Sequence, residues 1–211
     1  MIFWGYTTQD QNRGSEIMFN EDIMKLLNEY RSGVAFDISR KSTGVTVWYN
    51  GLLSLYRIVT PYKYSKKDPF WEAKMVRSFR KDIKGIIEGK EFDIVVIENT
   101  INGCNAITNK ELILLNTVPD QLILDDVAKL NGNMYRLEAS KWRKNLGELG
   151  YISKEKDKKK ATEETLKSYG FRYVLEHEND TENTKRNSGY YDICDSTGIL
   201  LGGMRLDKER R

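Results

Sequence analysis

Four acidic residues stand at positions from which carboxylates can do chemistry. Asp37 lies near the end of a short apolar segment, and Glu98 directly follows the apolar run 92–97. Asp192 and Asp195 are three residues apart at the start of a predicted final helix, so they share one helix face. The ends of two adjacent strands and a helix packed across them can converge on one point. We therefore predict that the four carboxylates meet at one edge of a sheet.

Carboxylates gathered in this way repel one another in a low-dielectric site. Such a cluster is stable only if a cation neutralises it or if some of its members are protonated. Hard oxygen ligands suit Mg²⁺ or Mn²⁺. Two such ions about 4 Å apart can activate a water and stabilise the leaving oxygen in phosphodiester hydrolysis. The pattern predicts a catalytic site holding two divalent ions, with Asp37, Glu98, Asp192 and Asp195 as metal ligands.

Each acid also has an ordinary structural explanation. Asp37 could form the turn after a strand, and Glu98 could be a polar residue at a strand end. Asp192 and Asp195 could be first-turn acids that the helix dipole favours. The combination favours the shared site, because an acid follows an apolar strand twice and a helical pair comes after both.

Composition excludes several other classes of protein. The chain has 211 residues, the length of one domain, and its 12 Tyr, 7 Phe and 4 Trp argue against a disordered chain. A single histidine, His177, argues against a Ser-His-Asp triad and against a His-rich zinc site. Two cysteines, Cys104 and Cys194, cannot staple a fold of this size, which favours a reducing, cytoplasmic setting. No apolar run of 18 residues and no secretory signal is present, so no membrane partner is expected.

Hydrophobic periodicity predicts a β-β-β-α-β-α-β-α-α order followed by a closing helix. Asn50-Gly51 is a strong hairpin turn between the second and third strands. Pro119 marks a break within a helical stretch, and Gly202-Gly203 is expected to end the last helix. Segment 171–175 is a short strand or merely extended, and 176–189 reads as a loop. The predicted strands are 33–38, 45–49, 52–59, 92–97 and 134–137, and the predicted helices are 21–31, 69–87, 108–130, 140–146, a helix ending at Tyr169, and 190–201.

This order predicts an α/β fold with a mixed five-stranded sheet, in which three antiparallel strands precede parallel strands and helices cover both faces. We divide the chain into an N-terminal extension (1–32), one α/β domain (33–204) and a charged C-terminal tail (205–211). Packing, dimer contact and DNA contact are all possible roles for the extension.

The net charge of +3 is unevenly distributed. Residues 140–172 hold ten basic and five acidic residues. Two explanations of this excess stay open on charge alone: a solvated helix face or loop, and a patch that binds a polyanion. The densest part of the excess consists of Lys154, Lys156, Lys158, Lys159 and Lys160.

Three short motifs make the sequence resemble a known family. Residues 36–44, with a hairpin after them, resemble the first motif of RuvC-type Holliday junction resolvases. Residues 94–98 resemble their second motif, and 191–196 resemble their last, an acid-x-x-Asp followed by a small residue on the closing helix. The resemblance covers about residues 33–203 in the right order, and the compact single domain looks most like the resolvases carried by phages of Gram-positive bacteria.

The resemblance implies an RNase H-like fold and metal-dependent hydrolysis of a DNA phosphodiester, leaving a 5′-phosphate and a 3′-hydroxyl. It implies that Asp37, Glu98, Asp192 and Asp195 bind two Mg²⁺ or Mn²⁺ ions per active site. It further implies a homodimer that nicks opposed strands of a four-way or branched DNA, in the bacterial host cytoplasm if the protein is phage-encoded. Helix 108–130 would occupy the dimerisation position, or serve as a core helix of the monomer, or both.

In this family a basic segment before the penultimate helix approaches the junction backbone, which DNA-binding proteins contact mainly through its charge. The lysine-rich stretch occupies that place, but the apolar spacing after it allows more than one alignment. The predicted nucleic-acid-binding residues are Arg40, Lys41, Arg143, Lys144, Lys154, Lys156, Lys158, Lys159 and Lys160. Arg40 and Lys41 could equally form a solvated turn, and Trp142 beside Arg143 is more typical of a core aromatic.

One departure from the family concerns the loop after Glu98. Cellular RuvC proteins place an aromatic residue there, whereas segment 99–106 has none, which favours broader action on branched DNA over sequence-selective cleavage. Two alternative functions remain: another RNase H-like nuclease, acting on RNA–DNA hybrids or flaps, and a non-catalytic nucleic-acid-binding module. No convincing Gly-rich phosphate loop is present, so no nucleotide cofactor is expected.

Overall fold

The computed structural model describes residues 2–4, 19–59, 68–99, 106–147 and 158–211. These residues form one sheet with the strand order β1-β4-β3-β2-β5-β6. β2, β3 and β4 pair antiparallel, whereas β5 and β6 run parallel to β2. The strands are β1 (Ile2–Trp4), β2 (Ser32–Asp37), β3 (Ser42–Tyr49), β4 (Leu52–Val59), β5 (Glu91–Glu98) and β6 (Lys129–Leu137).

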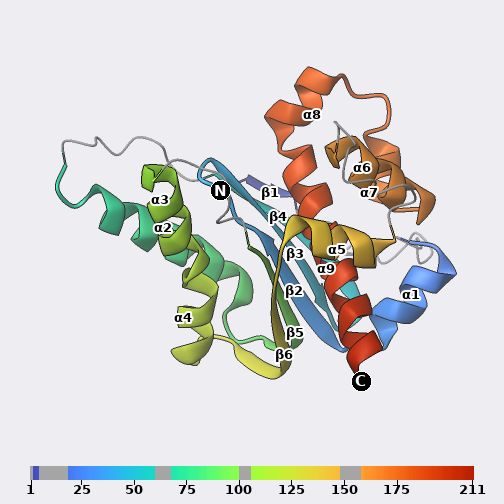
Figure 1. Cartoon of the computed structure of the whole chain (residues 1–211), viewed down its shortest axis with the longest axis horizontal. Helices are drawn as coiled ribbons and strands as arrows, with labels where there is room; N and C mark the ends of the chain where they lie inside the picture. The colour runs from blue at the N-terminus through green and yellow to red at the C-terminus, as the bar shows by residue number, and fades with distance from the viewer. Residues whose placement is uncertain (1, 5–18, 60–67, 100–105, 148–157) are drawn as a thin grey trace.

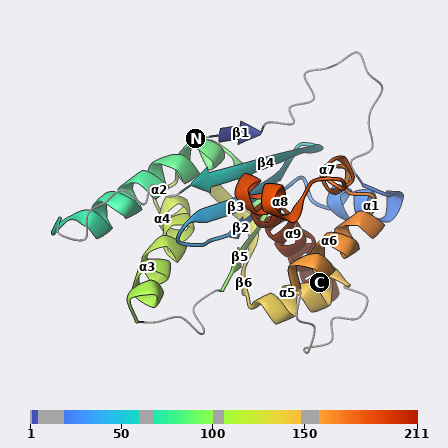
Figure 2. The ribbon, with the colours of Figure 1, turned by 90° about the horizontal axis from the view of Figure 1, so that it is seen from above.

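Helices cover both faces of this sheet (Figure 1). α2, α3 and α4 lie on one face, and α9 crosses the other with α5 and α1 beside it. α6, α7 and α8 gather around the N-terminal half of α9, as the view from above also shows (Figure 2). The helices are α1 (Glu21–Asn28), α2 (Trp71–Ile87), α3 (Ala106–Asn116), α4 (Val118–Leu124), α5 (Ala139–Leu146), α6 (Lys158–Ser168), α7 (Arg172–Glu176), α8 (Glu182–Ser188) and α9 (Tyr190–Arg210).

Side-chain alternation along the central strands decides which residues face α9. Val34 and Phe36 of β2 pack toward α2, whereas Ala35 packs toward α9. In β5, Val95 and Ile97 face α2, while Ile94 and Val96 face α9. Because successive strand residues point to opposite faces, the strands carry apolar residues on both sides, as expected for strands covered by helices on each face.

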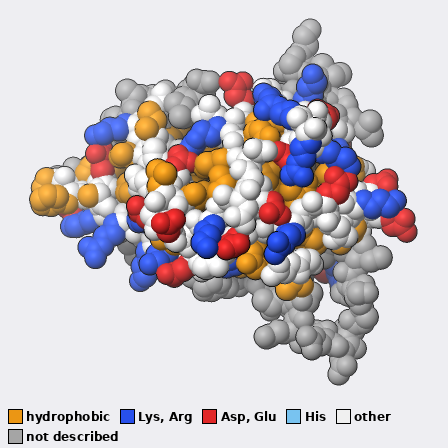
Figure 3. Space-filling view, turned by 90° about the horizontal axis from the view of Figure 1, so that it is seen from below, with side chains coloured by type: hydrophobic (Ala, Val, Ile, Leu, Met, Phe, Trp, Pro, Cys, Tyr) orange, Lys and Arg blue, Asp and Glu red, His pale blue; other side chains and the backbone are white. Residues whose placement is uncertain are grey.

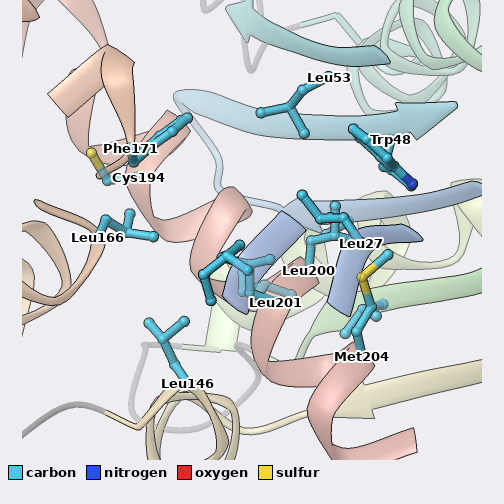
Figure 4. Close-up of a cluster of buried hydrophobic side chains, with 14 of the residues drawn as sticks. Leu27, Trp48, Leu53, Leu146, Leu166, Phe171, Cys194, Leu200, Leu201 and Met204 are labelled. Carbon is cyan, nitrogen blue, oxygen red and sulfur yellow. The ribbon is translucent and has the colours of Figure 1, made fainter. Parts of the chain in front are cut away.

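The core beneath α9 joins segments that are far apart in the chain. Leu200, Leu201 and Met204 of α9 meet Leu27 of α1 and Trp48 of β3 (Figure 4). The indole N–H of Trp48 donates to the backbone oxygen of Tyr30 at 3.0 Å, so its polar atom is satisfied inside this core. α1 is therefore packed into the domain, although it comes before the first central strand.

The mixed sheet with three leading antiparallel strands and the hairpin turn at Asn50-Gly51 are confirmed, with φ values of 51° and 81° at the two turn residues. The sheet has one more strand than predicted, because β1 pairs with β4 at the edge. The break predicted at Pro119 is confirmed, because α3 ends at Asn116 and α4 begins at Val118, but the predicted helix 108–130 is too long, since β6 already begins at Lys129.

Three predictions near the C-terminus are wrong. Segment 171–175 contains α7 rather than a strand, and the supposed loop 176–189 contains α8, which begins where Thr181 accepts a hydrogen bond from the Thr184 N–H. The last helix does not end at Gly202-Gly203. A Cβ at Gly202 would lie 2.4 Å from the Trp142 backbone oxygen, so this glycine permits close packing inside a continuous helix. The expected tail 205–211 thus continues α9 as far as Arg210.

Within the described residues, no helix combines the length and apolarity needed to cross a membrane. On the face seen from below, basic and acidic side chains lie among one another rather than in one large field of a single sign (Figure 3). Local clusters of charge therefore matter more to this molecule than its small net charge.

Candidate active site

Two of the four predicted acids lie side by side at the carboxyl ends of neighbouring parallel strands. Asp37 is the last residue of β2 and Glu98 the last of β5. The register pairs Phe36 with Ile97, so each acid is one residue beyond the same rung of the ladder. The alternation of the strands places both acids on the α9 face of the sheet.

The start of α9 lies directly on β3, which brings the remaining two acids to the same place. A Cβ at Gly44 would lie 1.9 Å from the backbone oxygen of Asp192, so only glycine allows this approach. Two residues further along β3 and about one turn further along α9, the Thr46 hydroxyl lies 2.8 Å from the Ser196 hydroxyl and 3.1 Å from that of Thr197. These contacts fix the rotation of α9, and they direct Asp192 and Asp195 toward the ends of β2 and β5.

Polar partners from two other elements, α5 and β4, hold the acids. The Arg143 guanidinium of α5 is paired with Asp195 at 3.3 Å, and both side chains are buried. The Trp142 indole N–H donates to Glu98 at 2.9 Å. On the opposite side, Arg57 of β4 lies 3.7 Å from Asp192. A carboxylate held by a donor in a buried site keeps one orientation, since its alternatives leave the donor unpaired.

The charges of the four acids act on one another. Burial raises the pKa of Asp37 well above its ordinary value, and the charges of Asp195, Glu98 and Asp192 raise it further. The Lys159 ammonium opposes this shift. Asp37 is thus the acid that the cluster disfavours most strongly in its ionised form, and a cation at the cluster would favour ionisation.

The neighbouring acids respond in the same direction. Burial raises the pKa of Glu98, and the charge of Asp195 adds to this, against the Trp142 hydrogen bond and the charges of Arg143 and Lys159. Burial also raises the pKa of Asp195, although Arg143 and Lys159 oppose it. The cations present in the chain therefore compensate the cluster only in part.

The donor chemistry of the cluster fits a hard divalent cation, because every candidate ligand atom is a carboxylate oxygen. In the described part of the chain, the cations near the cluster neutralise its negative charge only in part. The side chains are not closed around an ion, however. Among the described residues, no three His, Cys, Asp or Glu side chains are grouped tightly enough to hold a metal. The pairing of Asp195 with Arg143 and of Asp192 with Arg57 accounts for this looser arrangement.

The predicted DNA-binding cations are placed differently from one another. Arg143 is buried against Asp195, and Arg40 forms an ion pair with the buried Glu111 of α3. Lys41 and Lys144 are exposed, as are Lys158, Lys159 and Lys160 at the start of α6. Lys154 and Lys156 lie outside the described residues, as does the loop 100–105 after Glu98, including Cys104. Cys194 is a buried free thiol.

Sequence reasoning missed two residues at this site. Arg57 lies in the middle of a predicted strand, and only the packing of α8 and α9 across the sheet edge brings it to Asp192. Tyr191 belongs to the last of the three motifs, but nothing in the sequence indicates that its ring centroid lies 5.3 Å from the Lys159 ammonium. Trp142 is a core aromatic as expected, and its indole N–H is in addition a partner of Glu98.

No family model matches the sequence and no curated protein matches it, so likeness is seen at the level of structure. The chain is similar to Thermus thermophilus RuvC, with a TM-score of 0.56 and 10% identity over 85% of this chain and 96% of that one. The chain has a RuvC-like fold. A second structure, T. thermophilus RuvC in complex with Holliday junction substrate, gives the same TM-score at 8% identity over 84% of this chain and 95% of that one.

A Fowlpox virus resolvase in complex with substrate Holliday junction DNA is more distant, with a TM-score of 0.39 and 13% identity over 83% of this chain and 97% of that one. The RuvC-like fold confirms the α/β architecture expected from the sequence. At these identities the likeness concerns the fold, while the function depends on the side chains described above.

Proposed function

We propose that this chain is a divalent-metal-dependent endonuclease that resolves Holliday junctions and other branched DNA by paired phosphodiester hydrolysis. The observation that carries the proposal is the cluster of Asp37, Glu98, Asp192 and Asp195, in which at least three carboxyl groups have raised pKa values at one edge of a RuvC-like sheet. The RuvC structures of similar fold include one bound to a junction, which supports the choice of substrate.

In this proposal the four acids would hold two Mg²⁺ or Mn²⁺ ions. When bound, such ions make a water nucleophilic and stabilise the leaving oxygen, which gives a 5′-phosphate and a 3′-hydroxyl. The chain's own residues orient these ligands. Trp142 donates to Glu98 and restricts its orientation, while Arg143 and Arg57 pair with Asp195 and Asp192.

Lys159 is the cation best suited to meet the scissile phosphate. Its charge lowers the pKa of Asp37, Glu98 and Asp195 against the effect of burial, so it lies within electrostatic reach of all three. It is exposed, and it therefore pays little desolvation when a phosphate approaches. We assign backbone contacts farther from the site to the exposed Lys41, Lys144, Lys158 and Lys160.

Paired nicking needs two active sites, and we propose a homodimer formed through α3 and α4. Ile113 of α3 and Leu124 of α4 are 45% and 81% exposed, so these helices offer apolar side chains that a second copy could cover. We further propose that the protein is of the phage-encoded type and works in a bacterial host cytoplasm, in keeping with the free thiol of Cys194.

The test is cleavage of end-labelled four-way junctions with Mg²⁺, with Mn²⁺ and with EDTA. We expect metal-dependent nicks at opposed positions, whose products a DNA ligase reseals because they carry a 5′-phosphate and a 3′-hydroxyl. Asp37→Asn is the inactive variant, and Asp22→Asn at an exposed position of α1 is the matched control. Preferential cleavage of an RNA–DNA hybrid or a flap, or equal behaviour of wild type and Asp37→Asn, contradicts the proposal.

A further inference from the structure

Tyr191 is anchored at both ends of its side chain. The residue lies in the first turn of α9, immediately before Asp192, and is only 7% exposed. Its ring packs edge-on against Tyr190, with 5.2 Å between ring centroids and an interplanar angle of 78°. Its hydroxyl is 2.9 Å from each carboxylate oxygen of Glu182 in α8. The plane of this ring is therefore fixed by the core on one side and by a carboxylate on the other.

Lys159 rests on the open face of that ring. It belongs to the first turn of α6, its side chain is exposed, and its Nζ lies 5.3 Å from the Tyr191 ring centroid. A cation at this distance from an aromatic face is attracted by the quadrupole of the ring. A lysine on a solvated helix otherwise samples many rotamers, so the contact restricts where the ammonium can be.

The ring restricts the ammonium to a place next to the acid cluster, here called its mouth, because Tyr191 immediately precedes Asp192 in the first turn of α9. Lys159 opposes the raised pKa values of Asp37, Glu98 and Asp195. Its neighbour Lys160 pairs at 3.9 Å with Glu164 of the same helix. Of the three adjacent lysines that begin α6, Lys159 is the one whose ammonium lies over the Tyr191 ring.

A purely structural role for Tyr191 leaves its hydroxyl unexplained. A core aromatic needs only its ring, and phenylalanine supplies that without a polar atom to satisfy. Here the hydroxyl leaves the core to reach Glu182, whose side chain is 67% exposed and also lies 3.8 Å from Arg186. The hydroxyl thus fixes the ring from the solvent side, where Lys159 sits.

We propose that Tyr191 is a positioning residue: anchored by Glu182, its ring holds the Lys159 ammonium at the mouth of the acid cluster to receive the phosphate of a phosphodiester substrate. The inference deepens the proposed function and rests on it for the identity of the substrate. The placement of Lys159 itself is a property of the free protein, and it can be measured without any reaction.

The first experiment measures that placement in the full chain. Reductive ¹³C-dimethylation keeps lysines charged, and the Lys159 resonance is identified by its loss in Lys159→Arg. We expect the wild-type signal upfield of the exposed lysines because of the Tyr191 ring current, at the exposed position in Tyr191→Leu, and part of the way toward it in Tyr191→Phe, which keeps the ring but loses its bond to Glu182. Glu182→Gln, which leaves the core ring in place, should shift it part of the way. A wild-type signal at the exposed position, or one that Tyr191→Leu leaves unchanged, overturns the inference.

The second experiment is a double-mutant cycle on junction cleavage. Lys159→Ala is expected to lower kcat by about 100-fold, as for loss of one preorganised charge donor. Tyr191→Leu should lower kcat by about 2- to 5-fold, the value of an exposed cation–π contact, with KM nearly unchanged. In the Lys159→Ala background Tyr191→Leu should have no further effect, and in the wild-type background Tyr191→Phe should lower the rate less than Tyr191→Leu because it keeps the ring. Additive losses overturn the inference, because they mean that Tyr191 acts independently of Lys159.

The two readouts separate failure of the inference from failure of the proposed function. An upfield Lys159 signal in a protein that cleaves no DNA refutes the nuclease and the phosphate role, while the ring contact stands. Cleavage that is normal in Tyr191→Leu, with an unshifted Lys159 signal, leaves the nuclease intact and removes the positioning role. Circular dichroism of each variant shows that it is folded, and Glu182→Gln provides a surface substitution if Tyr191→Leu does not fold.

Discussion

The two ends of α9 carry buried acids in opposite electrostatic conditions. At the N-terminal end, burial raises the pKa of Asp195 and the partial compensation by Arg143 does not cancel it. At the C-terminal end, burial alone would raise the pKa of Asp207, but hydrogen bonds and a nearby charge outweigh it and hold the pKa below its ordinary value. The donors to Asp207 are Tyr30 at 2.9 Å, Asn133 at 2.6 Å, Tyr135 at 2.8 Å and Arg211 at 2.8 Å.

The difference indicates that Asp207 and Asp195 have different roles. Asp207 is 1% exposed and satisfied by donors from β6, from the segment after α1 and from its own helix, so it ties these elements together. Asp195 is 7% exposed and shares its charge with other acids. An acid cluster short of positive charge costs stability, and proteins retain such clusters where a ligand supplies the missing charge. The same helix thus carries a fully hydrogen-bonded acid at one end and, in the proposed function, a ligand-binding acid at the other.

The largest expected effect separates the two ends by activity. Asp195→Asn should lower junction cleavage by about 1000-fold or more, because an amide is a poor ligand and a poor partner for developing charge. Asp207→Asn should cleave within a few-fold of wild type at a temperature where both proteins are folded. Single-turnover rates at saturating metal measure both, and equal losses at the two positions contradict the comparison.

The same pair of variants should differ in the reverse sense in stability. Asp207→Asn should lower the free energy of unfolding by about 2–4 kcal/mol at neutral pH, because it weakens charge-assisted bonds inside the fold. Since the pKa of Asp207 is lowered, its contribution is present above its ordinary value and is lost as pH falls through the folded value. Urea unfolding of both variants at pH 7 and at about pH 2.5 provides the measurement, with a smaller deficit expected for Asp207→Asn at the lower pH.

Removing one negative charge from the acid cluster should have a moderate effect on the stability of the metal-free protein. The pKa of Asp37 is raised, so the unfolded chain loses its proton first and stability falls as pH rises above the ordinary carboxyl range. Asp37→Asn removes this penalty. We expect its Tm to exceed that of wild type by about 2–4 °C at pH 8, the shift that corresponds to about 1 kcal/mol in a chain of this size.

Two controls accompany this measurement. The gain in Tm should be absent at pH 4, where Asp37 is protonated in wild type, and it should shrink when Mg²⁺ is added to wild type. Differential scanning fluorimetry in EDTA and in Mg²⁺ gives both values. A lower Tm for Asp37→Asn at pH 8 means that the ionised carboxylate stabilises the fold, contrary to the comparison.

The smallest effect concerns the donor to Glu98. Trp142→Phe keeps the buried aromatic and removes the indole N–H, so the pKa of Glu98 should rise further. Cleavage should fall a few-fold at neutral pH and recover at higher pH, with the acidic limb of the pH–rate profile displaced upward. A uniform loss at every pH indicates that the substitution acts through packing alone.

The central sheet and the proximity of Asp37 and Glu98 were predictable because both follow from local pattern. Apolar segments ending in Asp37 and Glu98 belong to parallel neighbours, and equal register then places the two acids together. The hairpin at Asn50-Gly51 was predictable for the same reason, since its turn chemistry is contained in two residues.

The predictions that failed depended on contacts between distant segments. Gly202 carries a helix-ending residue type, yet it lies inside α9 because the α5 backbone packs against it. Arg57 and Asp192 are 135 residues apart in the sequence, and no local pattern predicts that they form a pair. Within the lysine-rich block, only the position of the Tyr191 ring distinguishes Lys159 from its neighbours.

Gly44 allows the close contact between β3 and the start of α9 on which the whole site depends. A methyl group there would meet the carbonyl oxygen of Asp192 at 1.9 Å, and a backbone atom cannot swing aside as a side chain can. The start of α9 would have to lift from the sheet, taking two carboxylates with it while Asp37 and Glu98 stayed behind. A displacement of about 1 Å costs on the order of 100-fold in rate for a preorganised site. Because residue 44 is glycine and has no methyl group, α9 can pack close enough to β3 to align the four acids.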